Sequence, residues 1–136
     1  MKIVLDTNIL VSAFAVGGNP ARVLDLVVNG EVDGATSEHL ISELTRILDL
    51  KFEFDGQQLS RIENIIRAAF IVVESNGSPP AISRDPDDDH VLELAKSAEA
   101  NFIVSGDKDL LILGRYLGIS ITTATDSLAE ITDTIG

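Results

Sequence analysis

The sequence carries acidic residues at points where strands and helices could bring them together. Asp6 follows one short apolar run, and Asp107 follows another. Asp88 and Asp89 stand at the start of a helical pattern. The chain has no cysteine, and its two histidines lack the spacing of a zinc site. Carboxylates alone are hard oxygen ligands, so we expect a site for Mg²⁺ or Mn²⁺ and chemistry at phosphate groups.

Strands that alternate with helices would position these acids. The predicted strands are short and apolar, and they lie at residues 3–5, 34–36, 71–73, 102–104 and 120–122. The predicted helices carry apolar residues at the helical period, and they lie at residues 20–29, 38–48, 55–69, 87–99, 108–113 and 126–131. This order predicts an α/β fold with a parallel sheet, right-handed crossovers and helices on both faces.

Turn and cap residues mark the boundaries of these elements. Ser37 is a predicted N-cap, and Asn19-Pro20 resembles a cap followed by proline at the first helical position. Residues 74–86, rich in Ser, Gly and Pro, form the longest predicted loop. Because the same alternation of elements continues on both sides of this loop, we expect a single domain over residues 1–136.

The predicted topology brings three of the acidic positions to one edge of the sheet. Asp6 and Asp107 both follow strands, and ligands of an open parallel sheet bind at the carboxyl ends of its strands. Asp89 lies at the start of helix 87–99, which enters from the same edge. An acid at a helix start could serve the helix dipole alone. Three acids that arrive from distant positions instead favour a shared site.

Glu43 is the fourth candidate, and its assignment is less direct. It lies in helix 38–48 between Ile41 and Leu44, on the flank of the apolar stripe, from which it could point along the sheet edge. Glu38 and His39 compete for the same role. A solvated glutamate is the ordinary alternative for such a position.

Composition limits the function classes. The chain has 22 Asp and Glu against 10 Lys and Arg, a net charge of −12, which argues against a basic nucleic-acid surface. The excess acids could serve solubility, hold divalent cations or face a basic protein partner. No glycine-rich phosphate loop is present. With no apolar run near the roughly 18 residues of a membrane span and no secretion signal, we expect a cytoplasmic protein without a membrane partner.

Three segments together resemble the PIN domain, namely IVLDTNILVSA, RDPDDDHVLELA and ANFIVSGDKDLL. More narrowly, they are similar to the PIN-family (VapC-like) toxins of prokaryotic toxin–antitoxin modules. The resemblance covers about residues 1–125. It implies a Rossmann-like α/β/α sandwich with a central, mostly parallel sheet. It also implies RNA cleavage that depends on Mg²⁺ or Mn²⁺, with a metal-bound water as the nucleophile.

The resemblance assigns the metal-binding and catalytic acids residue by residue. The first acid is Asp6, and the helix acid is Glu43 rather than Glu38. The third is Asp89, although Asp88 and Asp85 are close enough in the sequence to leave the register open. The fourth is Asp107. The remaining matches are supporting residues: Asn8 and Ser105 beside the first and fourth acids, Asp109 as an auxiliary acid, and Arg84 and Lys108 as possible contacts to RNA phosphates.

The resemblance further implies an RNA substrate, a cognate antitoxin as partner, and a homodimer. Two alternatives remain open from the sequence. One is a catalytically silent PIN-fold module that binds RNA or protein. The other is a phosphatase of the haloacid dehalogenase type, which needs a second Asp two residues after the first. Asn8 occupies that position and counts against it.

Overall fold

A six-stranded sheet with the order β3-β2-β1-β4-β6-β5 forms the centre of the protein. The computed structural model describes residues 1–74 and 86–135, apart from the side chains of residues 86–88, 134 and 135. The strands are β1 (Lys2–Leu5), β2 (Asp33–Thr36), β3 (Phe70–Val72), β4 (Phe102–Val104), β5 (Arg115–Tyr116) and β6 (Ile119–Thr122). All neighbouring pairs are parallel except β5 and β6. The mostly parallel sheet expected from the sequence is therefore confirmed.

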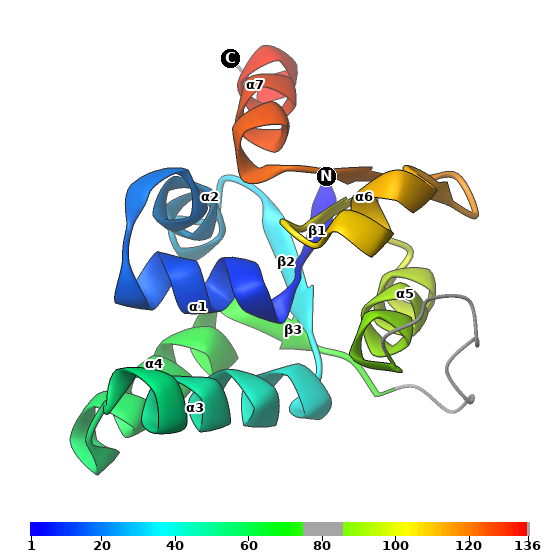
Figure 1. Cartoon of the computed structure of the whole chain (residues 1–136). Helices are drawn as coiled ribbons and strands as arrows, with labels where there is room; N and C mark the ends of the chain where they lie inside the picture. Colours follow the sequence, from blue (N-terminus) through cyan, green and yellow to red (C-terminus); the bar gives the residue numbers. More distant parts are fainter. Residues whose placement is uncertain (75–85, 136) are drawn as a thin grey trace.

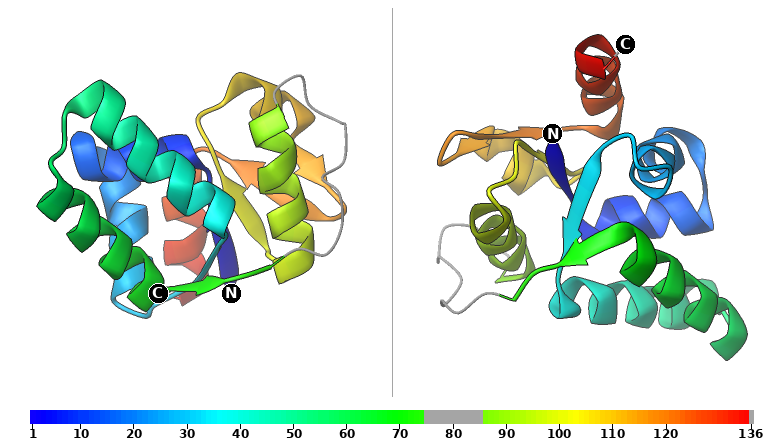
Figure 2. Two further views of the ribbon diagram at one scale, coloured as in Figure 1. Left: turned by 90° about the horizontal axis from the view of Figure 1, so that it is seen from below. Right: turned by 180° about the vertical axis from the view of Figure 1, so that it is seen from behind.

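Helices cover both faces of this sheet, as Figures 1 and 2 show. They are α1 (Thr7–Ala15), α2 (Gly18–Val28), α3 (Glu38–Phe52), α4 (Gly56–Ala69), α5 (Pro86–Ala98), α6 (Lys108–Leu113) and α7 (Ala124–Ile135). One apolar core lies between the sheet and helices α1–α4 and α7. A second lies between the opposite face and helices α5 and α6. The expected α/β/α sandwich is confirmed, with an uneven distribution of helices.

Several predicted boundaries and cores are confirmed. Ser37 caps α3, because its Oγ accepts a hydrogen bond from the backbone N–H of Leu40 at 3.2 Å. α4 begins with a reciprocal capping box between Asp55 and Gln58. The apolar residues predicted for helix 87–99 are all buried against the sheet: Val91, Leu92, Leu94, Ala95 and Ala98. In α4, by contrast, Ile65 was counted among the apolar residues at the helical period of helix 55–69, which predicts burial, but it is exposed, and that prediction was wrong.

Two elements were not predicted, and one helix begins elsewhere. α1 was not expected, and its buried residues Ile9, Leu10 and Val11 join the core formed with α2 and α3. β5 is a two-residue strand that pairs only with β6. α2 begins at Gly18 after Gly17, whose φ of 105° only glycine adopts readily. Pro20 therefore lies in the first turn rather than at its first position.

Gly34 in β2 lies under the side chains of two neighbouring elements. A Cβ atom added there would come within 2.6 Å of both Phe70 and Val27. The absence of a side chain lets β3 and α2 approach β2 closely. No single helix of the described part is long and apolar enough to cross a membrane, and α1 and α2 pass that test only as a pair bent by 102°.

Candidate active site

Asp6 is a buried carboxylate at the carboxyl end of the central strand β1, with only 5% of the residue exposed. Its backbone N–H donates to the carbonyl oxygen of Val104 in β4 at 3.0 Å, which continues the pairing of Leu5 with Val104. Asp6 is also the residue before α1, but its side chain accepts no capping hydrogen bond from that helix. The carboxylate is therefore directed to another use than capping.

Ser105 holds that carboxylate. Its Oγ donates to Oδ2 of Asp6 at 2.7 Å and accepts the backbone N–H of Asp107 at 2.9 Å. Ser105 is fully buried, and its own N–H donates to Thr122 in β6. One hydroxyl thus links the first and the fourth predicted acids, and we call this arrangement the Asp6–Ser105–Asp107 bridge. The supporting role that the sequence predicts for Ser105 has this geometric basis.

Asp107 stands at the beginning of α6, and its carboxylate caps that helix. Its Oδ1 accepts from the N–H groups of Asp109 at 2.8 Å and Leu110 at 3.3 Å. Lys108 and Asp109 are exposed in the first turn of α6. Asp107 can both lie at the sheet edge and cap a helix, because α6 begins shortly after the carboxyl end of β4.

The alternation of side chains along the strands places Asp6 and Ser105 on one face of the sheet. Val4 and Ile103 belong to the core under α5, and the residues two further along share their face. α5 runs from the carboxyl edge of the sheet back to the amino end of β4, because β3 and β4 are both parallel to the strands between them. The start of α5 therefore lies at the same edge as Asp6.

The structure separates the two glutamates that compete in α3. Arg67 of α4 binds Glu38 through two hydrogen bonds of 2.7 and 2.8 Å and binds Glu63 at 3.0 Å. These bonds lower the pKa of the Glu38 carboxyl and raise that of Arg67. The side chain of Glu43 is only 11% exposed, with its Oε2 at 3.9 Å from Nε2 of His39. This geometry favours Glu43 over Glu38 as a site residue.

His39 of α3 and His90 of α5 stack face to face. Their ring centroids are 3.8 Å apart and the rings are inclined by 21°. The sequence excludes a zinc site at these two histidines by their spacing, but it does not predict that they lie in contact. The stack joins the N-terminal halves of α3 and α5, which begin at the same edge of the sheet. It brings His90 of α5 to the side of α3 that carries His39, one turn before Glu43.

Asp89 and Glu93 are both buried on α5, one turn apart. Glu93 accepts a hydrogen bond from Oγ of Ser97 at 3.2 Å. Glu93 was not predicted as a site residue, although it lies four residues after Asp89 and therefore on the same helix face. Arg84 and Asp85 lie outside the described residues, as does the side chain of Asp88.

Divalent cations match the donor chemistry of the four predicted acids. Asp6, Glu43, Asp89 and Asp107 offer carboxylate oxygens, the donors that Mg²⁺ and Mn²⁺ prefer. Within residues 1–74 and 89–133, no three acidic or histidine side chains gather closely enough to hold one ion. The bridge joins the Asp6 carboxylate to the backbone N–H of Asp107, whose own carboxylate caps α6, and the histidine stack connects the helix of Glu43 with α5.

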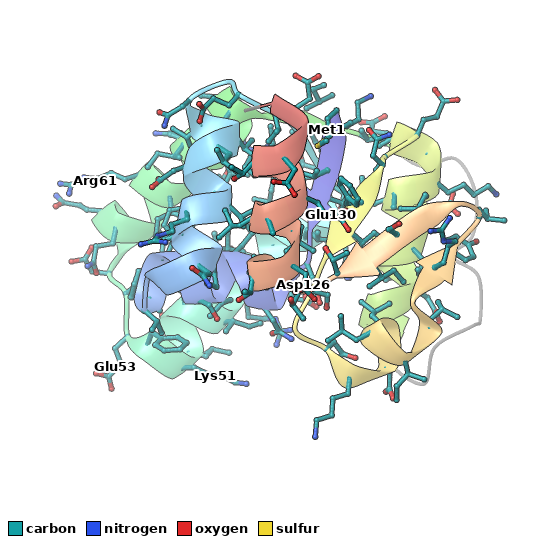
Figure 3. All side chains as sticks on the ribbon, turned by 90° about the horizontal axis from the view of Figure 1, so that it is seen from above. Met1, Lys51, Glu53, Arg61, Asp126 and Glu130 are labelled. Carbon is teal, nitrogen blue, oxygen red and sulfur yellow. The ribbon has the colours of Figure 1, made fainter. Side chains whose placement is uncertain are left out.

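The negative charge of the protein is not confined to this edge. Figure 3 shows Glu130 further along α7 and Glu53 just after the end of α3, with Arg61 at the left of the view on α4. All three of these residues are exposed. Exposed acids therefore also lie on parts of the surface away from the candidate site.

Comparisons with known proteins agree with this architecture. A family model described as PIN domain matches residues 2–109. The structure of VapBC2 from Rickettsia felis bound to a DNA fragment from their promoter aligns with a TM-score of 0.62 at 15% identity, over 89% of this chain and 97% of that one. FitAcB from Neisseria gonorrhoeae aligns with a TM-score of 0.57 at 14% identity, over 90% and 98%. No curated protein matches the sequence.

Proposed function

Because this chain belongs to the PIN domain family, we propose that it is an endoribonuclease that hydrolyses RNA phosphodiester bonds with Mg²⁺ or Mn²⁺. PIN domains are typically nucleases and generally use divalent metal ions. The observation that carries the proposal is the Asp6–Ser105–Asp107 bridge. A buried carboxylate that does not cap its own helix, held by a buried hydroxyl at the ligand-binding edge of the sheet, suits a functional role.

In this proposal the chain's residues bind and orient, and none is a nucleophile. Asp6, Glu43, Asp107 and one acid of α5 would hold the cation. When bound, the cation would activate a water molecule and neutralise charge on the phosphate. Ser105 fixes the orientation of the Asp6 carboxylate through Oδ2. Lys108, exposed directly after Asp107, would contact an RNA phosphate.

The third acid is proposed on α5. The sequence predicts Asp89, which is 7% exposed and shares a helix face with the buried Glu93. The burial of Asp89 supports this assignment over Asp88, the alternative that the sequence leaves open.

Paired variants decide between these two positions. We expect Asp89→Asn to reduce RNA cleavage more than about 100-fold, since replacing a residue that merely supports a ligand costs about 10–100-fold. Asp88→Asn should cost less. Loss with Asp88→Asn and normal cleavage by Asp89→Asn would instead assign the third acid to position 88.

We also propose that the chain is the toxin of a toxin–antitoxin pair and acts in the cytoplasm. The solved Rickettsia felis relative is VapBC2, bound to DNA from their promoter. A net charge of −12 suits a basic protein segment as the binding element of an antitoxin. Co-expression with the product of the neighbouring open reading frame should give a stable complex. Size-exclusion chromatography with light scattering would show whether the chain alone is a homodimer.

One observation favours a second candidate, a PIN-fold module that binds RNA or protein without cleaving it. Among the described side chains, three acids do not gather around one point. The two functions are separated by incubating total RNA with the purified protein and Mg²⁺ or Mn²⁺ and mapping new RNA ends. Specific ends that vanish in EDTA support the nuclease. RNA binding without new ends supports the module.

A further inference from the structure

The histidine stack forms an aromatic surface beside the proposed active site. His39 and His90 stack with centroids 3.8 Å apart. His39 lies one helical turn before Glu43, with 3.9 Å between its Nε2 and the Glu43 Oε2. His90 directly follows Asp89 in α5. The stack therefore lies beside Glu43, and its second ring comes from the helix that carries Asp89.

The His39 side chain is partly open to solvent, with 40% of its surface exposed. Exposed aromatic rings are rare in this protein. Among its Phe and Tyr side chains, all within the described part, Phe52 alone is exposed. Phe52 lies 13 residues further along α3, or about 20 Å away at the usual helical rise. At the edge that carries the acids, His39 is thus the aromatic ring open to solvent.

Single-stranded RNA is commonly held by aromatic side chains. Its unpaired bases stack on rings, and this contact tolerates different base identities because every base has a flat face. A pair of stacked imidazoles can extend its stack by one more ring. A surface of this kind next to a phosphate-cleaving centre would fix one nucleotide relative to the scissile bond.

We propose that the His39–His90 stack is a platform for one RNA base next to the cleaved phosphate. This inference rests on the proposed nuclease function and names a residue that positions its substrate. It implies selection of flexible, unpaired RNA, because a base within a duplex cannot stack on a protein ring.

The test compares the binding of intact RNA with the binding of RNA that lacks the base at one position. The probe is a fluorescein-labelled single-stranded RNA of mixed sequence, together with versions that carry one abasic site. Binding is measured in EDTA, so that no cleavage occurs, for wild type, His39→Ala and His39→Phe. Thermal melting followed by circular dichroism checks that each variant is folded.

At one position, the abasic site should weaken wild-type binding by about 5- to 150-fold, the usual range for one stacked base. The same abasic site should have little effect on His39→Ala, and His39→Phe should restore the discrimination. A purely structural stack would instead make His39→Ala weaken intact and abasic RNA equally, and that result would overturn the inference. If the wild type cleaves RNA and His39→Ala weakens binding of intact and abasic RNA equally, only the base platform is refuted. If wild type neither binds nor cleaves RNA, the proposed function fails as well.

Discussion

Removal of the Ser105 hydroxyl tests the bridge that organises the candidate site. Ser105→Ala deletes the donor to the buried Asp6 carboxylate and the acceptor of the Asp107 N–H. Alanine keeps the strand end and adds no bulk at a fully buried position. The variant therefore changes two hydrogen bonds and little else.

The expected magnitude follows from the burial of the groups involved. A hydrogen bond to a charged group contributes about 1.5–3 kcal/mol to folding, and a buried N–H left without a partner costs about 1–3 kcal/mol. The two effects share one hydroxyl and do not add fully. We expect Ser105→Ala to lower the free energy of unfolding by about 2–4 kcal/mol.

Urea denaturation measures this difference, with Ser60→Ala as the matched control. Ser60 is an exposed serine in α4, and its replacement should change stability by less than about 0.5 kcal/mol. RNA cleavage by Ser105→Ala should also fall by about 10–100-fold, because Asp6 loses its orienting partner. If Ser105→Ala is as stable and active as Ser60→Ala, the role assigned to the bridge is refuted.

Two further predictions concern packing and charge. Gly34→Ala forces a Cβ atom into neighbouring side chains and should lower the free energy of unfolding, measured in urea, by about 1–3 kcal/mol. Gly56→Ala is the control, because nothing lies within 4 Å of its added Cβ atom, and it should not destabilise the protein. Equal stability of the two variants would refute the packing argument. Arg67→Gln should return the lowered pKa of Glu38 toward its ordinary value in an NMR titration. Since the folded pKa lies below 4.5, the ion pair stabilises the fold above that pH and this contribution disappears as pH falls through the folded pKa; an unchanged Glu38 titration would exclude the pair in solution.

The sequence predicts those parts of the fold in which local signals and packing agree. Ser37 and Asp55 mark helix starts because their side chains satisfy backbone N–H groups within the same few residues. The apolar run 102–104 predicts a buried strand because it is covered on both faces of the sheet. α1 lacks a cap signal of this kind, because Asp6 before it makes no side-chain capping hydrogen bond, and the helix packs against α2 and α3.

Some residues of the candidate site could likewise be predicted from the sequence, and others could not. Asp6 and Asp107 can be found from the sequence, because residues that follow parallel strands share an edge. The stack of His39 on His90 cannot, since it depends on how α3 and α5 approach each other from different faces. The third acid is another case. The motif leaves Asp85, Asp88 and Asp89 open, and the burial of Asp89 depends on how α5 packs against the sheet.

The proposed place of Asp6 in a metal-dependent nuclease site is tested by the variant Asp6→Asn. Asp6→Asn is nearly isosteric and can still accept the Ser105 hydrogen bond, so the fold should persist. Cleavage of RNA in Mg²⁺ or Mn²⁺ should fall more than about 100-fold, beyond the effect of removing a supporting residue. Wild-type cleavage that vanishes in EDTA and is lost in folded Asp6→Asn is the predicted result. Undiminished cleavage by folded Asp6→Asn would contradict the account.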